Sequence, residues 1–337
     1  MTEPVDVGYL CGFTGEDSWL LAGRGRPWLL TDFRFAEQAE RECPGVGLVV
    51  RKGSMVDALA RLAKRKHVAS LGFDPEVVSV SLRGRVAKAL KKVRLVPVAG
   101  VMSALRVRKD AVELRAIRRA VVVAEEAWRR FRRRIRLGMT EGRLAAELDH
   151  QMRLAGAEGP AFPTIIAIDA SASMPHARPG GRRLRRGSVL LVDFGAKVDG
   201  YVCDLTRVLL AGRIRPRVRQ AYKVVQDAQA AAIARTGPGV AFTEVDAAAR
   251  GVIQAAGFGD VFQHGTGHGI GRQVHEAPVL GPRSPKGALE PGMVVTVEPG
   301  VYFRGRFGIR IEDDVLVTRR GRRVLTHLEK DLEAMVL

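Results

Sequence analysis

The sequence predicts an α+β fold in which a small N-terminal α/β domain, residues 1–105, precedes a larger pseudo-symmetric domain, residues 106–337. Two observations lead to this prediction. Short apolar runs between Gly- and Pro-rich turns fill the N-terminal region, whereas the remainder opens on a long amphipathic pattern with helical spacing. The larger region also contains one plan twice: a helix, a second helix that begins near a Thr-Glu pair, and apolar strands with histidine.

The N-terminal region is expected to form strands and turns with some helix. Residues 18–35 (SWLLAGRGRPWLLTDFRF) place two apolar runs around a Gly-Arg-Gly-Arg-Pro turn, which predicts a β-hairpin. Residues 54–66 predict a helix, residues 67–75 a strand that runs into a turn, and residues 93–100 a closing strand.

The charge of the chain is +19, from 55 Lys and Arg against 36 Asp and Glu, and is concentrated in residues 129–136 and 182–186. A nucleic-acid surface is one interpretation of these clusters. The first cluster, however, belongs to a predicted helix over residues 110–137, which Asp110 is positioned to cap. We therefore interpret the arginines as a solvated helix face and expect no nucleic-acid partner. The opposite, buried face is predicted to consist of Leu114, Ile117, Val121, Ala124, Trp128, Phe131 and Ile135.

The repeated plan lies in residues 138–159 and 239–259, each with a Thr-Glu pair before a helical pattern and Ala-Gly after it. Thr140 and Thr243 are the expected N-caps of the two helices. A helix over about residues 217–235 precedes the second copy, as the long helix precedes the first.

Other features bound the class of protein. No apolar run reaches the roughly 18 residues that a membrane span requires, and the first residues lack the pattern of a signal peptide. A disulfide framework is not expected, because the cysteines are far apart and odd in number: Cys11, Cys43 and Cys203. These features predict a cytoplasmic protein without a membrane partner.

Residues 264–278 (HGTGHGIGRQVHEAP) contain three of the seven histidines, interleaved with glycines. They do not form a dinucleotide-binding motif, because Ile270 occupies the last glycine position of the G-x-G-x-x-G pattern. Histidine is the most common metal ligand and a frequent acid or base near neutral pH. The segment therefore predicts a catalytic or metal site rather than isolated packed histidines.

Two acids are predicted to meet in residues 188–210, where an Asp-Gly turn separates two apolar runs and indicates a β-hairpin. Asp193 and Asp204 then lie on one face of the hairpin, directly opposite each other or one diagonal step apart. Two carboxylates so close among apolar residues repel each other, and a cation is the simplest partner. Cys203 points to the other face and is expected in the core.

Residues 293–318 repeat this arrangement, because Glu298 ends one apolar strand and Glu312 lies within the next. Four acids in pairs on two hairpins, with one imidazole, suit two divalent ions that activate water for hydrolysis. Mn²⁺ is the expected ion, with Co²⁺ and Zn²⁺ as alternatives. Single acids are usually surface or turn residues, and that class is expected to contain Asp199, Asp313 and Asp314.

The order and spacing of these residues resemble the pita-bread metallopeptidase family, which includes methionine aminopeptidase, aminopeptidase P, prolidase and creatinase. The resemblance covers nearly the whole chain and rests on LLVDFGAKVDGYVCDLTR (190–207), GTGHGIGRQVHEAP (265–278), TVEPGVY (296–302) and GIRIEDD (308–314). It implies a pita-bread catalytic domain with five ligands to two ions: Asp193 on one ion, Asp204 and Glu312 bridging both, and His268 and Glu298 on the other.

The same resemblance assigns roles around the ions. His176 and His275 would hold the scissile carbonyl and the tetrahedral intermediate. Glu298 would carry the proton of a hydroxide that bridges the ions to the leaving nitrogen of proline. His264 and Arg310 match substrate-binding positions of the proline-specific branch.

Two N-terminal segments, YLCGFTG (9–15) and TDFRFAEQA (31–39), resemble the small domain of aminopeptidase P and prolidase, which methionine aminopeptidases lack. In relatives a helix and a strand precede the first segment, whereas Tyr9 is close to the start here. Either the true start lies upstream or the domain has lost its first strand.

The resemblance thus implies a homodimeric peptidase that cleaves the Xaa-Pro bond at the N-terminus of dipeptides or short peptides with proline in second position. It leaves open whether the enzyme is a dipeptidase or an aminopeptidase P. The alternative from another class is an inactive pita-bread protein that binds RNA or protein. The complete set of five ligands argues against it, because buried acids without a metal are costly.

Overall fold

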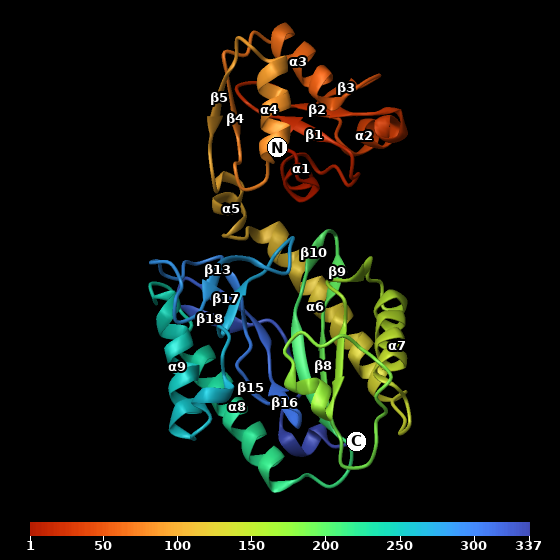
Figure 1. Ribbon diagram of the computed structural model, residues 1–337, viewed down its shortest axis with the longest axis vertical. Helices are drawn as coiled ribbons and strands as arrows, with labels where there is room; N and C mark the ends of the chain where they lie inside the picture. Colours follow the sequence, from red (N-terminus) through yellow and green to blue (C-terminus); the bar gives the residue numbers. More distant parts are fainter. The chain divides into compact units, whose positions relative to one another are not determined.

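A computed structural model describes all 337 residues. The chain divides into two compact units, Met1–Leu105 and Arg106–Leu337, which we call the smaller and the larger unit. Figure 1 colours the smaller unit from red to orange and the larger one from yellow to blue. No helix combines the length and the apolar character that crossing a membrane would require.

The smaller unit contains two short sheets with helices around them (Figure 1). The predicted hairpin is confirmed, because β1 and β2 pair antiparallel with Leu20 opposite Leu29, and β3 then pairs with β2 in parallel. The other sheet is a parallel pair, β4 and β5. The strands of the smaller unit are β1 (Trp19–Leu21), β2 (Trp28–Thr31), β3 (Gly47–Val50), β4 (Ser70–Phe73) and β5 (Arg94–Pro97). Its helices are α1 (Pro4–Cys11), η1 (Phe33–Phe35), α2 (Ala36–Glu42), α3 (Met55–Arg65), α4 (Val80–Ala89) and α5 (Val101–Arg106).

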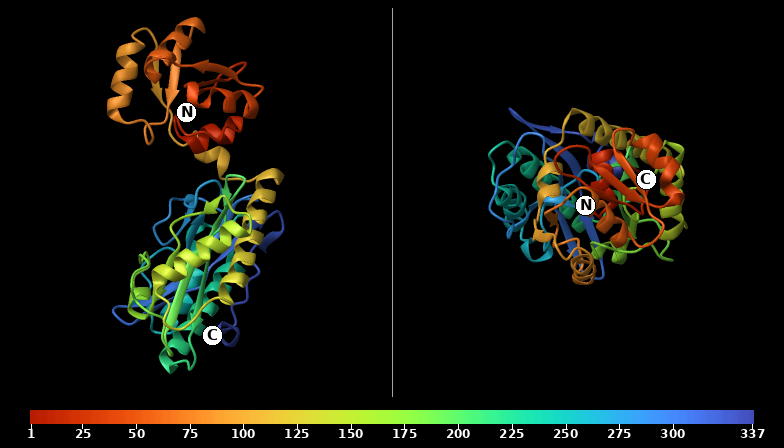
Figure 2. Two further views of the ribbon diagram at one scale, coloured as in Figure 1. Left: turned by 90° about the vertical axis from the view of Figure 1, so that its right-hand side faces the viewer. Right: turned by 90° about the horizontal axis from the view of Figure 1, so that it is seen from above.

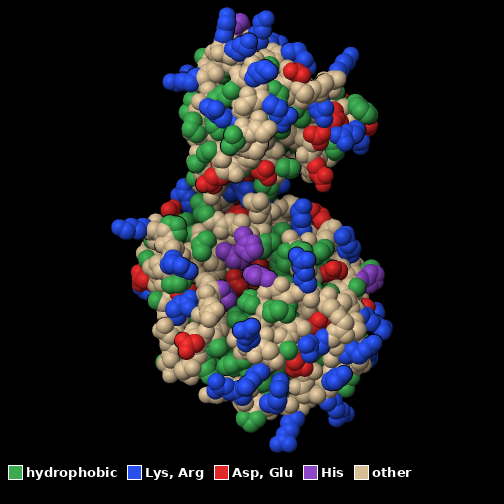
Figure 3. Space-filling model, viewed as in Figure 1, with side chains coloured by type: hydrophobic (Ala, Val, Ile, Leu, Met, Phe, Trp, Pro, Cys, Tyr) green, Lys and Arg blue, Asp and Glu red, His purple; other side chains and the backbone are tan.

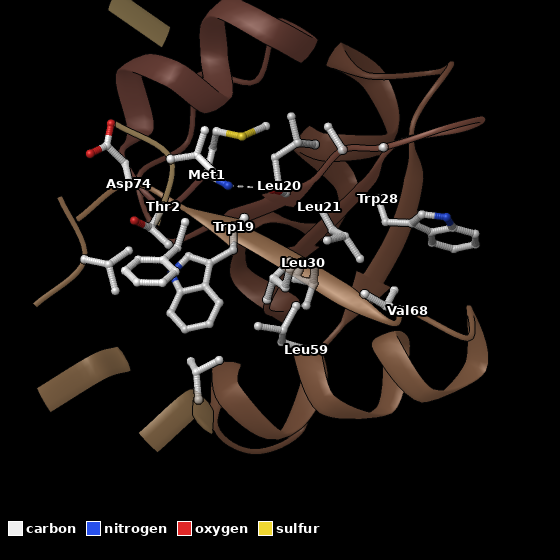
Figure 4. A pocket seen from close by; sticks show the side chains of 18 of the residues that line it. Met1, Thr2, Trp19, Leu20, Leu21, Trp28, Leu30, Leu59, Val68 and Asp74 are labelled. Atoms are coloured by element: carbon white, nitrogen blue, oxygen red, sulfur yellow. Dashed lines mark hydrogen bonds between the residues drawn. The ribbon is translucent and has the colours of Figure 1, made fainter. Parts of the chain in front are cut away.

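A mostly apolar pocket of about 730 Å³ lies in the smaller unit, lined by residues of β1, β2, β4 and α3 (Figure 4). Trp19, Leu30 and Leu59 contribute to its wall. Beside it, the amino group of Met1 donates a hydrogen bond of 2.8 Å to the carbonyl oxygen of Leu20. The pocket contains none of the predicted site residues, all of which lie in the larger unit.

The larger unit contains one arrangement twice. Each copy begins with two helices, which are α6 (Ala111–Arg132) and α7 (Glu141–Leu154), then α8 (Pro216–Arg235) and α9 (Phe242–Ala255). The first copy has strands β6 (Gly159–Pro160), β7 (Ile165–Ile168), β8 (Val189–Phe194), β9 (Ala196–Val198), β10 (Tyr201–Val202) and β11 (Leu205–Leu210). The second has β12 (Gly267–Gly269), β13 (Glu276–Leu280), β14 (Val294–Val297), β15 (Gly300–Phe303), β16 (Phe307–Arg310), β17 (Asp313–Thr318) and β18 (Gly321–Val324). Short 3₁₀ turns are η2 (Asp169–Ser173), η3 (Gly259–Val261) and η4 (Leu332–Met335).

The strand pairing confirms the predicted pseudo-symmetry. In the first copy β7 pairs with β8 and β8 with β11, and in the second β12 pairs with β14 and β14 with β17, all antiparallel. The helices of the two copies lie on opposite sides of these strands (Figures 1 and 2). Both copies share one continuous buried core.

The start of the long helix is as predicted. Asp110 accepts hydrogen bonds from the backbone N–H groups of Val112 and Glu113 at 2.7 and 2.9 Å, and the Glu113 carboxylate accepts the N–H of Asp110. This reciprocal cap satisfies N–H groups that a helix leaves free at its first turn. The predicted apolar stripe is buried, apart from the half-buried Leu114, but the helix ends at Arg132 rather than at residue 137.

The two predicted threonine caps have different outcomes. Thr140 caps α7 as expected. Thr243 does not cap α9, because the N-cap is Ala241, and Glu244 accepts the N–H of that residue at 3.4 Å. Ala241 also forms an isolated β-bridge with Ala288. The extended pairing therefore lasts up to the residue before the helix, which places Thr243 inside the first turn.

The two copies are joined by a β-bridge between Thr206 and Glu312. The buried guanidinium of Arg207 donates to the carbonyl oxygens of both bridge residues, at 2.9 and 2.6 Å, and to Asp313 Oδ1 at 2.7 Å. Burial alone would raise the pKa of Asp313, but Arg207 and Lys330 outweigh it and lower the pKa to about 2. Arg207 and Asp313 therefore form a charged anchor behind the bridge.

Of the acids that we assigned to surface or turns, only Asp199 follows the prediction. It lies in the hairpin turn with a positive φ of 53° and pairs with Arg119. Asp313 and Asp314 are buried instead, because β17 is an inner strand with neighbours on both sides. Asp314 accepts the backbone N–H of Asp204 at 3.1 Å.

Removing the cation of the anchor should destabilise the protein strongly. We expect Arg207→Met to lower the free energy of unfolding by about 3–5 kcal/mol, because it removes a buried cation that donates to Asp313 and to the carbonyl oxygens of both bridge residues. The matched control is Arg219→Met, which removes an exposed ion pair with Glu333 and should change stability by less than about 0.5 kcal/mol. Urea unfolding followed by circular dichroism measures both, and equal effects would contradict the anchor role.

Candidate metal centre and active site

The first hairpin brings Asp193 and Asp204 to one face. Asp193 lies opposite Thr206, which is two residues beyond Asp204, so the acids are one diagonal step apart. The pairing needs Gly195, because a Cβ atom there would lie 1.8 Å from the carbonyl oxygen of Cys203. Cys203 itself is buried, in agreement with its expected place in the core.

The second hairpin places Glu298 opposite Glu312. Val297 pairs with Asp313 before a short break in the strands, and Gly300 pairs with Arg310 after it. The strand register is the same on both sides of the break, and in that register Glu298 lies opposite Glu312. Glu312 was expected inside a strand, but it lies in the short break between β16 and β17. There its backbone pairs with Thr206 rather than with its own hairpin partner.

These three pairings form a single row across four chain segments. Residues opposite each other in an antiparallel pair have side chains on the same face, and so do residues two apart along a strand. The row consists of Asp193, Thr206, Glu312 and Glu298. Asp204 and Arg310 lie on the same face, two residues along their strands from Thr206 and Glu312, and on opposite sides of this row because the bridge is antiparallel.

His268 completes the site from the adjacent strand β12. Its Nδ1 lies 3.1 Å from the Gly269 carbonyl oxygen, which can only accept, so Nδ1 carries the proton. Its Nε2 lies 3.4 Å from Glu298 Oε1 and 3.9 Å from Asp204 Oδ2. Burial lowers the pKa of His268, so a neutral imidazole directs its lone pair at the acids.

The donor set fits a divalent ion. Three of the predicted ligands each have a buried carboxylate oxygen without a hydrogen-bond partner: Asp193 Oδ1, Asp204 Oδ1 and Glu312 Oε1. Ligand atoms of Asp204, His268 and Glu312 all lie within 4.8 Å of one another. Buried polar atoms without partners are rare in folded proteins, so their convergence on one imidazole nitrogen marks a place for a cation.

The acids of the site also raise one another's pKa values. Burial, reinforced by the neighbouring carboxylates, raises the pKa of Asp204 and that of Glu312 well above their usual ranges. Burial raises the pKa of Glu298 to about 7, with Arg310 opposing the rise and Asp193 adding to it. A divalent ion would favour the ionised carboxylates and so compete with these protons.

Arg310 and His264, the predicted substrate-binding residues, are joined by Tyr302. Arg310 is buried, pairs with Asp193 and donates to the Tyr302 hydroxyl at 2.7 Å. His264 Nδ1 donates to a backbone carbonyl, so its Nε2 accepts the Tyr302 hydroxyl proton at 2.9 Å. Sequence reasoning missed Tyr302, although its even spacing from Glu298 along the hairpin was the available signal.

His176 and His275, the predicted substrate-side histidines, are both exposed. The His275 ring packs edge-on against His268, with 4.3 Å between ring centroids. His176 follows Pro175, whose carbonyl oxygen lies 3.4 Å from Arg310. Figure 3 shows histidine side chains gathered in a hollow on one face of the larger unit, with acidic side chains among them.

Comparisons with known proteins agree with this arrangement. Residues 115–319 match metallopeptidase family M24, and residues 1–108 match the creatinase/prolidase N-terminal domain. The chain is 36% identical over 332 residues to an uncharacterized peptidase of Bacillus subtilis, covering 98% of this chain and 94% of that protein. It is 37% identical over 232 residues to a Xaa-Pro dipeptidase of Pyrococcus furiosus, covering 69% and 66% of the two chains.

Solved structures show the same fold over the whole chain. An X-Pro aminopeptidase from Thermotoga maritima superposes with a TM-score of 0.93 at 34% identity, over 100% of this chain and 95% of that one. A Xaa-Pro dipeptidase from Bacillus anthracis gives a TM-score of 0.94 at 34% identity, over 98% and 92%.

The raised pKa of Glu298 predicts how the metal-free protein responds to pH. The folded protein keeps this proton up to about pH 7, whereas an ordinary glutamate releases it near 4.5. The parent therefore loses the contribution of this group to stability as the pH rises between these values. Glu298→Gln cannot titrate, so its free energy of unfolding relative to the parent should rise by on the order of 1–3 kcal/mol over that range. Urea unfolding with chelator at both pH values measures this, and a constant difference would contradict it.

Proposed function

The chain belongs to metallopeptidase family M24, and from this we propose that it hydrolyses the Xaa-Pro bond at the N-terminus of dipeptides or short peptides. The observation that carries the proposal is the row of buried acids with unpartnered oxygens beside the neutral imidazole of His268. The Xaa-Pro dipeptidase and X-Pro aminopeptidase relatives support the substrate class.

The proposed ligands of two divalent ions are Asp193, Asp204, His268, Glu298 and Glu312. Bound there, the ions would polarise the scissile carbonyl and acidify a water molecule. Mn²⁺ is the proposed ion, because carboxylate-rich sites favour hard divalent cations. The relatives with named activities are peptidases, which does not support the alternative of an inactive RNA- or protein-binding module.

Glu298 is the proposed proton carrier. It takes a proton from the attacking water and delivers it to the proline nitrogen, which has no N–H of its own and cannot leave unprotonated. Its Oε1 lies close to His268 and its Oε2 is 3.9 Å from Arg310, so both oxygens face charged or polar groups of the site. Beside the ions its pKa would be lowered, and it could still accept a proton from the attacking water because that water would itself be acidified.

The histidines are proposed to act on the substrate side. His176 and His275 would donate to the carbonyl oxygen as it gains negative charge, which fits their exposure and the contact of the His275 ring with His268. His264 and Arg310 would face the proline side of the substrate, held in place by Tyr302. The proposal extends to both dipeptides and longer peptides, and to a homodimer.

The function is tested by assaying the purified protein with Mn²⁺ on Ala-Pro, Ala-Pro-Ala and the matched peptide Ala-Ala. We expect cleavage of one or both proline peptides and at least about a hundredfold lower kcat/KM for Ala-Ala. The ratio of the two proline substrates identifies the enzyme as dipeptidase or aminopeptidase P. Equal cleavage of Ala-Ala would reject proline specificity, and no cleavage with metal bound would reject the activity.

Two histidine variants separate ligands from substrate-side groups. The parent should bind close to two Mn²⁺ per chain by elemental analysis after reconstitution. His268→Ala should lose metal, because its lone pair faces the acids. His275→Ala should keep both ions and lose about a hundredfold or more in kcat, the usual effect of removing a group that stabilises an oxyanion. Loss of metal by His275→Ala to the same extent would mean that the two assignments are wrong.

A further inference from the structure

The loop that carries His275 is folded around the side chain of the next residue, Glu276. Glu276 Oε1 accepts the backbone N–H groups of Arg272 and Gln273, at 2.9 and 3.0 Å. A charged carboxylate is a strong acceptor for such groups. The loop between β12 and β13 is thus closed by the first side chain of β13, one residue after His275.

Two cations from the start of the larger unit hold this carboxylate. Arg106 pairs with Oε1, and the Lys109 ammonium lies 3.2 Å from Oε2. The side chains of Arg106, Lys109 and Glu276 are only 9%, 1% and 6% exposed, so solvent screens these pairs little. Burial alone would raise the pKa of Glu276, but Lys109 and Arg106 outweigh it and lower the pKa.

The Glu276 carboxylate and the Lys109 side chain pack closely against Gly271 of the loop. A Cβ atom on Gly271 would lie 2.6 Å from Glu276 Oε2 and 2.9 Å from Lys109 Cε. Arg106 also donates to Gln273 Oε1 at 2.7 Å, and the backbone N–H of Lys109 donates to the Gly292 carbonyl at 2.8 Å. The cations therefore contact both the loop and the core of the unit.

We infer that Glu276, held by Lys109 and Arg106, is a positioning residue that sets the direction of His275 toward the substrate. The inference rests on the proposed function, in which His275 donates to the scissile carbonyl. Its ring touches His268 from an exposed position, so its direction follows from the backbone that carries it. The hydrogen bonds of the Glu276 carboxylate that hold the loop come from Arg272 and Gln273, neither of which is a proposed metal ligand.

The test is a double-mutant cycle between Glu276→Gln and His275→Ala in the Mn²⁺-loaded protein. Glu276→Gln should lower kcat for the better proline peptide about tenfold or more, with metal content unchanged and KM within about threefold. In the His275→Ala background the same change should alter kcat by less than about twofold, because its effect acts through the missing ring. Equal losses in both backgrounds would overturn the inference in favour of a general structural role.

Hydrogen exchange tests whether Glu276 holds the loop, without any activity measurement. Amides of residues 271–276 should exchange at least about tenfold faster in Glu276→Gln than in the parent, while those of α8 stay protected. Unchanged exchange in the loop would overturn the inference. A parent that cleaves no proline peptide would reject the proposed function, and the exchange result would still decide whether Glu276 holds the loop.

Lys109→Met provides a second variant that leaves the loop sequence intact. It keeps most of the aliphatic stem and should reproduce the faster exchange and the lower kcat in weaker form. The matched control is Lys223→Met, which removes a lysine from an exposed helical ion pair with Asp227 and should change neither. Equal behaviour of the two lysine variants would contradict the role of Lys109 in holding Glu276.

Discussion

The bridge between Thr206 and Glu312 is the contact on which the larger unit depends. It turns two separate hairpins into one row of four positions, and three of those positions are acids. Like charges opposite each other weaken a sheet, so the bridge between Thr206 and Glu312 needs stabilising contacts on the other face of the sheet. Arg207 supplies them by donating to both bridge carbonyls, with Asp313 as its counter-ion. The fold thus separates its charges, with the paired anchor on one face and the acids that keep unpartnered oxygens on the other.

This separation explains why the site costs stability. The anchor satisfies its charges internally, and the pKa of Asp313 is accordingly lowered. The acids of the site have Arg310 as their one close cation, and the pKa values of Asp204, Glu298 and Glu312 are raised. A group whose pKa is raised by burial and repulsion is held in an unfavourable place by the rest of the fold. Such strain is typical of ligand and catalytic positions rather than of structural ones.

Much of this could be predicted from local sequence, and the failures have a common cause. The Asp-Gly turn placed Asp193 and Asp204 on one face, because a two-residue turn determines the register of its hairpin. Asp313 and Asp314 were assigned to the surface because their neutralising partners are distant in sequence: Arg207 for one and the N–H of Asp204 for the other. Thr243 failed as a cap because the bridge from Ala241 to Ala288 is a tertiary contact. Local patterns thus predicted elements and register, whereas charge pairing across the two copies needed the fold.

The pseudo-symmetry also explains why the site itself is asymmetric. If Thr206 and Glu312 are equivalent positions, then Asp193 corresponds to Glu298 and Asp204 to Arg310, so one copy has a guanidinium at the position where the other has a carboxylate. Arg310 pairs with Asp193 and leaves Asp204 without a cation. The Thr206 hydroxyl donates to Glu312 Oε2 at 2.6 Å and leaves Oε1 free. Each copy therefore supplies one group that occupies a carboxylate oxygen of the other copy, while Asp193 Oδ1, Asp204 Oδ1 and Glu312 Oε1 remain without a partner near the lone pair of His268.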